Sequence, residues 1–532
     1  MSIDLRRPAL TLGLLLALSG AAGAEGPLSA IDWLSKSVAA PPPESRPQDG
    51  RPPSSVPLPR ADSAEPAVTR DASPAEVTVS VLGAPTPDGV GLLSSARTGL
   101  PRTLWGLMRA EEVARLLSSA RTDSLPALRG LMITLLLAEA EPPVDSGPQG
   151  VVLLARIDKL LDMGALDQAG ALAVLAGDTT PELFRRRFDI ALLTGDESAA
   201  CEEMRASPQL APTLPARIFC LARAGDWNAA ALTLGTARAL GQVAPEDEAL
   251  LERFLDAELT DSLPALPPPR RPTPLIWCIY EAIGEPLPTL GLPLAFSRAE
   301  LRPQSGWKAQ IEAAERLAQA GAITPNMLLG IYTERSPAAS GGVWDRVDLF
   351  QRFDAALSKG DKAAVSAILP QVWQAMVSAE LEPPFAALFA TRLMDLDLEG
   401  EAGALAFRIG LLSSGYEAVA LRRKARMPRP DTEEAFLIGL ARGDIGGLTP
   451  PDSMARGLAP AFLAPAIGDN ARRALDDKRF GEALLLAMEQ VERGVQGDPR
   501  SVAEGLSLLR GMGLEETARR TALELLLLER RG

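Results

Sequence analysis

Apolar residues recur at helical spacing from Thr103 to the end of the chain, in short stretches that Gly or Pro closes and that Asp, Ser or Thr begins. Three of these closures, at Gly164, Gly195 and Gly225, lie 31 and then 30 residues apart, which is the length of one helical hairpin. Each glycine follows an apolar helical pattern and precedes one that starts with an acidic residue or small alanines. The pattern predicts closely packed antiparallel helix pairs, and therefore an all-α protein.

These residues resemble the tetratricopeptide-like (TPR-like) helical-repeat superfamily, in which helix A closes at a glycine and helix B carries a small residue where the helices cross. The best match runs from Leu221 through Gly225 to Ala229 and Ala230. Weaker matches surround Gly360, Gly400, Phe480 with Ala483, and Gly513. The resemblance covers residues 103–532 and implies an α-solenoid, in which each hairpin contacts its neighbours.

Two proline-rich segments divide the chain. Ten prolines fall within residues 41–75, a composition that cannot bury enough apolar surface to offset its ordering entropy, so we expect a disordered linker there. The sequence DSLPALPPPRRPTP, at residues 261–274, interrupts the helical pattern a second time. It separates helical-repeat block 1, residues 101–260, from block 2, residues 275–532.

The residues between the linker and the repeats predict a short strand and a loop over residues 76–100. Val77, Val79 and Val81 alternate with polar residues there, which is typical of a strand. We expect the folded body to begin near Thr103.

The first residues have the features of an export signal. Arg6 and Arg7 precede an apolar run that ends at Leu18, and the small residues Ala-Gly-Ala end at Ala24. This pattern predicts a signal peptide over residues 1–24 and a periplasmic mature protein. No later stretch has 18 uninterrupted apolar residues, so no transmembrane segment is expected in the mature chain.

The segment LSAIDWLSKSVA, within residues 25–40, is amphipathic. Ile31, Leu34 and Val38 fall on one helical face with Trp33 beside it. A helix this short is only marginally stable alone, so we expect it to dock on a partner, with Trp33 as the anchor. The alternatives are that it folds back onto the protein's own repeats or is merely what remains after signal cleavage.

The chain contains no histidine and only three cysteines. Imidazole is the usual base beside a Ser or Cys nucleophile and the commonest metal ligand, so those triads, dyads and His-containing metal sites are excluded. Three thiols cannot form a four-thiolate zinc site. Metal-dependent catalysis would then need an all-carboxylate site, and we expect no catalytic, cofactor-binding or metal-binding residues. The net charge of −14 also disfavours nucleic acid as a partner, because an acidic surface repels phosphates.

Cys201 and Cys220 lie on either side of the proline-containing turn SPQLAPTLP, centred near Leu210. On antiparallel helices they come level, so a Cys201–Cys220 disulfide is expected. Cys278, in the apolar run LIWCIY, is then a buried free thiol. The alternative is that all three cysteines pack as small hydrophobic residues.

Several other motifs have structural explanations. Ser305 and Lys308 have the spacing of a Ser-x-x-Lys nucleophile motif, but Ser305 also fits a helix N-cap. The basic clusters Arg422–Arg429 and Arg185–Arg187 could bind an acidic partner or lipid head groups, or could stabilise helix ends. Five tryptophans are expected as core residues between hairpins: Trp105, Trp227, Trp277, Trp344 and Trp373.

Together these features favour a non-enzymatic periplasmic scaffold that binds an envelope or periplasmic protein. Its layout is similar to that of some periplasmic accessory proteins of the flagellar motor, which combine an export signal, a proline-rich stretch and helical repeats. The alternative is a peptidoglycan-active, lytic transglycosylase-like enzyme or its regulator. That chemistry requires a buried carboxyl group with a raised pKa.

Overall fold

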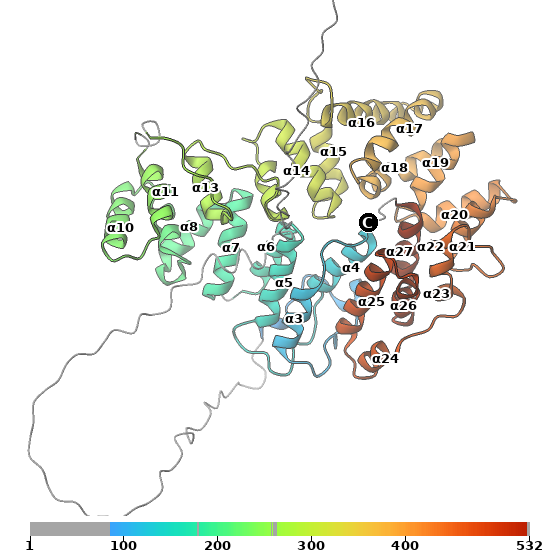
Figure 1. Cartoon of the computed structure of the whole chain (residues 1–532), viewed down its shortest axis with the longest axis horizontal. Coiled ribbons are helices and arrows are strands. Elements are labelled where there is room, and N and C mark those ends of the chain that lie inside the picture. Colours follow the sequence, from blue (N-terminus) through green and yellow to red (C-terminus); the bar gives the residue numbers. More distant parts are fainter. Residues whose placement is uncertain (1–85, 178–179, 257, 259–262, 529–532) are drawn as a thin grey trace, which may run out of the picture.

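The computed structural model describes residues 86–177, 180–256, 258 and 263–528 (Figure 1). Within these ranges the chain is helical, and its one extended pairing is an isolated bridge between Leu93 and Ala138. The predicted all-α class is therefore confirmed. Four predictions lie outside the described residues. They are the signal peptide, the segment containing Ile31, Trp33, Leu34 and Val38, the proline-rich linker, and the strand at Val77–Val81.

The first part of the body begins with the 3-10 helix η1 (Pro87–Gly89), well before the predicted start at Thr103. Its helices are α2 (Ser95–Thr98), α3 (Ala110–Ser119), α4 (Pro126–Leu137), α5 (Val151–Asp162) and α6 (Leu166–Leu175). The buried Asp88 carboxylate accepts a hydrogen bond from the Leu153 backbone N–H at 2.8 Å. The buried Arg156 guanidinium donates to the Val90 carbonyl at 2.6 Å. These polar contacts hold the residues before Thr103 against α5, which the apolar pattern alone did not indicate.

The next helices form an arm, which occupies the left of Figure 1. They are α7 (Pro181–Thr194), α8 (Glu197–Ala206), η2 (Pro208–Leu210), α9 (Leu214–Arg223), α10 (Trp227–Ala239), α11 (Pro245–Leu255) and α13 (Pro274–Ala282). The predicted closures at Gly164, Gly195 and Gly225 have φ values of 74°, 89° and 83°, just beyond the ends of α5, α7 and α9. This left-handed conformation favours glycine, so these helix ends follow directly from the sequence.

The arm returns to the body after the second proline-rich segment. Residues 263–273 lead into α13, which packs on both α7 and α11. The 3-10 helix η3 (Leu294–Leu301) then packs on α5 and α7. Leu294 approaches so closely that its Cγ would lie 2.8 Å from a Cβ on Gly164. The chain beyond the proline-rich segment thus starts in direct contact with the helices before it.

The remaining helices, yellow to red in Figure 1, pack mostly on their neighbours in sequence. They are α14 (Trp307–Gln319), α15 (Pro325–Thr333), α16 (Val343–Ser358), α17 (Lys362–Val377), α18 (Glu382–Leu396), α19 (Gly400–Leu411), α20 (Tyr416–Arg426), α21 (Thr432–Arg442), α22 (Ser453–Leu458), α23 (Pro460–Leu463), α24 (Asp469–Asp476), α25 (Phe480–Val495), α26 (Pro499–Gly511) and α27 (Glu515–Leu527). Buried aromatic rings join α16 to α18. Phe350 and Phe353 each contact Phe389 with ring centroids 5.2 Å apart.

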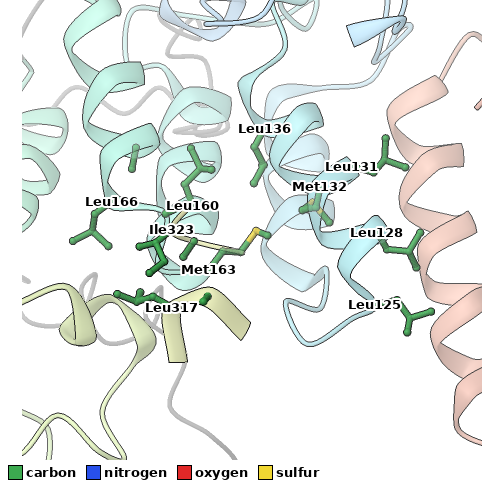
Figure 2. Packing of buried hydrophobic residues seen from close by; sticks show 14 of the residues in the cluster. Leu125, Leu128, Leu131, Met132, Leu136, Leu160, Met163, Leu166, Leu317 and Ile323 are labelled. Atoms are coloured by element: carbon green, nitrogen blue, oxygen red, sulfur yellow. The ribbon is translucent and has the colours of Figure 1, made fainter. Parts of the chain in front are cut away.

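The C-terminal helices close back onto the N-terminal ones. Helix α27 packs on α4, and α25 packs on α3; we call this junction the seam. In Figure 2, Leu125, Leu128 and Leu131 point toward a C-terminal helix, whereas Leu136 lies on the side of α5. Helix α4 is apolar on most of its surface because both of its sides are covered.

Two close contacts define the seam. The buried Glu524 carboxylate accepts a hydrogen bond from the Ala127 backbone N–H at 2.9 Å, across 397 residues of sequence. The buried Trp105 ring lies against Gly481, where an added Cβ would come within 2.3 Å of the ring. Only glycine therefore allows α25 to approach Trp105 this closely.

The predicted cysteine pair is joined in the arm. Cys201 of α8 and Cys220 of α9 form a disulfide with their Cα atoms 5.1 Å apart. Cys278 of α13 is a buried free thiol whose Sγ lies 3.4 Å from the Leu192 carbonyl oxygen. Burial raises the pKa of the Cys278 thiol well above its usual range, which makes it unreactive in the folded protein.

Thiol labelling tests this arrangement. We expect no labelling of the folded protein, one labelled cysteine after unfolding without reduction, and three after unfolding with reduction. Replacing Cys201 and Cys220 by Ser should lower the free energy of unfolding by about 3 kcal/mol, because the closed loop no longer restricts the unfolded chain. Labelling of all three thiols without reduction would contradict the pairing.

Asp189 of α7 is a buried carboxyl group whose Oδ2 finds no hydrogen-bond partner among the described residues. Burial raises the pKa of Asp189 to about 7, although Arg185 and Arg186 oppose the shift. The folded state therefore holds a proton that the unfolded chain releases near its ordinary pKa of 3.8. Tighter binding of this proton in the folded state adds to the free energy of unfolding. The added stability is fully present below about pH 4 and is lost as the pH rises toward 7.

Replacing Asp189 by Asn removes the free-energy cost of burying a charged carboxylate at high pH. We expect Asp189→Asn to raise the free energy of unfolding at pH 8 by about 2 to 4 kcal/mol, with the difference vanishing near pH 4. Urea unfolding across this pH range measures the effect. The exposed Asp348→Asn variant serves as the control and should not change the pH dependence. A difference between Asp189→Asn and wild type that does not vary with pH would contradict the assignment.

Candidate functional site

A large cleft opens at the seam, between α3 and α4 on one side and α24 and α25 on the other. Its volume is about 760 Å³. Apolar side chains contribute part of its lining, among them Leu116, Met132, Leu485 and Met488. The rest of the lining is charged or polar, so the cleft suits a ligand that has both apolar and charged groups. We call it the seam cleft.

Helix α25 supplies most of the acidic lining. Glu482, Glu489 and Glu492 are spaced seven and three residues apart, with Leu485 between them, so they project from one face of the helix. The preceding segment adds Asp477. The contact of Gly481 with Trp105 sets how closely this helix face approaches α3.

Glu492 differs from the other acidic residues of the cleft. Its side chain is only 12% exposed, and among the described residues its one ion pair is with Arg121, at 3.7 Å between Nε and Oε2. Burial raises the pKa of Glu492 to about 7; Arg121 opposes this shift, and Asp123 and Glu489 add to it. The carboxyl group therefore changes charge near neutral pH and is poorly compensated when charged.

Three other charged groups of the cleft, Arg479, Glu482 and Asp477, are closely paired with one another. Arg479 donates to Glu482 at 2.7 Å and to Asp477 at 3.0 Å. Arg473 donates to the side-chain oxygen of Asn470. Arg121 is half exposed, and its contacts with Glu492 and Asp123 are longer than hydrogen bonds. Glu489 is exposed and lies 3.7 Å from Arg493. Glu492 is therefore the cleft carboxyl group that combines burial with a loose ion pair, and Arg121 is the cation beside it.

A buried lysine holds the turn that carries Arg121. Lys159 of α5 donates to the carbonyl of Ser118 at 3.1 Å, to that of Ala120 at 2.7 Å, and to Asp162 at 3.4 Å. Burial lowers the pKa of Lys159, and Asp162 opposes the shift. The ammonium group satisfies the carbonyls at the end of α3, so it fixes the backbone directly before Arg121.

A second cleft, of about 560 Å³, lies on the other side of the same turn. Thr122 and Asp123 line it, together with the loop at residues 290–294, Arg316 and Glu380. Arg316 is already bound to Glu300 at 3.0 Å and to the Thr289 hydroxyl at 2.7 Å. The Arg316 guanidinium of this second cleft is therefore already compensated within the fold.

The basic clusters are held by acidic neighbours in the fold. Arg186 makes two hydrogen bonds of 2.6 Å to the buried Asp158, and Arg187 makes two to Glu203. In the second cluster, Arg423 pairs with Glu434 at 2.6 Å. Its other pairs are Arg422 with Asp395 and Arg426 with Asp397. These contacts pair five arginines of the two clusters with acidic side chains of the same chain.

The Ser305–Lys308 motif and the five predicted core tryptophans all lie among the residues that the structure describes. Helix α14 begins at Trp307 with Gly306 as its N-cap, so the predicted Ser305 cap is wrong by one residue. The Ser305 N–H instead belongs to the preceding turn and donates to Arg302, and Lys308 pairs with Glu312. Trp105 and Trp277 are buried, and Trp344 and Trp373 are partly buried.

The prediction that Trp227 is a core residue is wrong. It is 50% exposed, because among the described elements α10 packs on α9 and α11 and has no further helix layer over its outer face. Its ring still contacts Phe254, with centroids 6.2 Å apart.

Among the described residues, no group of three Cys, Asp or Glu side chains is placed to hold a metal ion. None of the described helices combines the length and apolar character needed to cross a membrane. No protein-family model, curated protein or solved structure matches the chain.

Proposed function

We propose that the protein is a non-enzymatic periplasmic α-solenoid scaffold that binds a polypeptide segment of an envelope protein in the seam cleft. The main support for this proposal is the environment of Glu492, whose carboxyl group is mostly buried and poorly compensated. It lies in a cleft of about 760 Å³ that is partly lined by apolar side chains. The TPR-like resemblance supports the scaffold role, because helical-hairpin arrays commonly present extended binding surfaces. The export pattern of residues 1–24 supports the location.

The chemistry of the cleft indicates what the bound segment contains. A lysine or arginine would compensate Glu492, and neighbouring apolar side chains would cover Leu116, Met132, Leu485 and Met488. The bound cation would favour the charged form of Glu492 and lower its pKa. Binding should therefore strengthen as the pH rises through 7. A narrower version of the proposal, based only on layout, is an accessory role in flagellar motility.

A second candidate function rests on the same carboxyl group. A glutamic acid with a pKa of about 7 in a cleft has the property that a general acid needs for glycan cleavage. In a lytic transglycosylase-like enzyme, Glu492 would protonate the leaving oxygen of the glycosidic bond. Incubation of the full chain with purified peptidoglycan sacculi distinguishes the two functions. Release of soluble muropeptides by wild type, and its loss in Glu492→Gln, would favour the enzyme and contradict the scaffold.

The binding proposal is tested with a photo-crosslinking residue at position 119, where the exposed Ser119 lines the cleft and both Arg121 and Glu492 are kept. Mass spectrometry of the crosslinked product identifies the captured segment, and a synthetic peptide of that segment then serves as the ligand. We expect wild type to bind the peptide about tenfold more tightly at pH 8 than at pH 6, because one carboxyl group titrates between these values.

The matched variants are Glu492→Gln and Glu334→Gln, since Glu334 is an exposed glutamate on another part of the surface. Glu492→Gln should weaken binding at pH 8 and abolish the pH dependence, whereas Glu334→Gln should behave as wild type. Equal affinity at both pH values for wild type, or an unchanged profile in Glu492→Gln, would contradict the proposal.

A further inference from the structure

Helix α10 exposes an apolar face at the far end of the arm, at the left edge of Figure 1. Leu232 is 73% exposed and Leu240, directly after the helix, is 64% exposed. The opposite face carries Ala230, Leu234 and Ala237, which are buried against the arm. The helix is therefore apolar on both sides, and only one side is covered among the described residues.

The exposed face has a symmetric pattern. Two rows of residues run along it at a spacing of four, one with Ala231, Gly235 and Ala239, and the other with Leu232, Thr236 and Leu240. Ala231–Leu232 precedes the central Gly235–Thr236 pair by four residues, and Ala239–Leu240 follows it by four. Each row therefore has nearly the same order of residues when it is read in either direction along the helix. Rows at this spacing are the ridges that interdigitate when two helices pack.

Gly235 has no role in the arm itself. It lies in the interior of α10, where glycine is less stable than alanine. A Cβ added at Gly235 would meet no heavy atom within 4 Å among the described residues. The fold thus gains nothing from glycine at this position, whereas a second helix crossing at Gly235 would gain a closer approach.

We infer that α10 is the interface between two copies of this chain, packed antiparallel about a two-fold axis near Gly235 and Thr236. Leu232 of one copy would lie against Leu240 of the other, and the two Gly235 positions would face each other at the crossing. An interface with two-fold symmetry requires a self-complementary surface, which the reversed pattern provides.

Charge favours a second copy as the occupant. The chain has a net charge of −14, so most of its surface repels an identical surface. Residues 227–239 of α10 contain no acidic side chain, and Arg238 is already paired with Glu248 and Glu252. The antiparallel arrangement also places each N-terminal end of α10 beside the C-terminal end of its partner, which is favourable for the helix dipoles. The inference does not depend on the seam cleft, and a dimer would present two such clefts to a partner.

The oligomeric state of the full chain tests the inference. Sedimentation velocity should show wild type as a dimer at micromolar concentrations. The variant Leu232→Glu/Leu240→Glu places like charges against each other across the axis, so it should be a monomer with the circular dichroism of wild type. A wild-type protein that stays monomeric, or a charged variant that stays dimeric, would overturn the interface.

Glycine substitutions separate association from folding. Gly235→Ala should raise the melting temperature of the monomeric Leu232→Glu/Leu240→Glu background, yet weaken the wild-type dimer by about tenfold. Gly330→Ala is the matched control. Gly330 also lies in a helix with no atom within 4 Å of an added Cβ, but its neighbours at a spacing of four are the polar Asn326 and Glu334. This control should leave the dimer unchanged, and equal weakening by both substitutions would contradict the proposal.

A cysteine placed near the axis tests the geometry directly. Thr236→Cys should form an intermolecular disulfide under mild oxidation, because residue 236 meets its own copy at the two-fold axis. Thr333→Cys, on an exposed position of α15, should not. Efficient crosslinking of Thr333→Cys but not of Thr236→Cys would overturn the arrangement. A monomeric chain in which the residue 28–39 segment crosslinks to position 236 would likewise exclude the second copy as occupant.

Discussion

The backbone N–H groups in the first turn of α4 need hydrogen-bond acceptors inside the protein. The junction between the N-terminal and C-terminal helices depends on the residue that supplies one of these acceptors. The first N–H groups of a helix have no partner within the helix, and the N-cap residue of α4, Leu125, has no side chain that could accept a hydrogen bond. Glu524, from α27, accepts a hydrogen bond from the Ala127 N–H. This bond joins the two ends of the helical body, and apolar packing of α4 on both sides accompanies it. The carboxylate also lies at the positive end of the α4 dipole.

The seam cleft is a consequence of this closure. Because α27 is fixed on α4, α25 is brought beside α3, and Gly481 lets it approach Trp105. Glu492 then lies opposite Arg121, whose backbone is positioned by the buried Lys159. The Glu492 carboxyl group is therefore mostly removed from water, and Arg121 only partly compensates its charge. Its raised pKa follows from this placement.

Local features of the fold were predictable from the sequence, whereas the seam was not. Left-handed glycines end α5, α7 and α9 where the pattern indicated, and Cys201 and Cys220 come level because a short turn separates their helices. Glu492 looks like any helical surface glutamate in the sequence, because its burial arises from helices hundreds of residues away. The sequence of α4, PALRGLMITLLL, did carry one usable signal, since a helix that is apolar on most sides is covered on most sides.

Hydrogen–deuterium exchange on Glu524→Ala is the most direct test of the claim that the seam holds the two ends together. Loss of the carboxylate leaves the first turn of α4 without its acceptor in a buried position. We expect faster exchange in α3, α4 and α25 together and no change in α8 to α10. The control Glu516→Ala, at an exposed position of α27, should have no effect. Faster exchange confined to α27, with α4 and α25 as protected as in wild type, would contradict it.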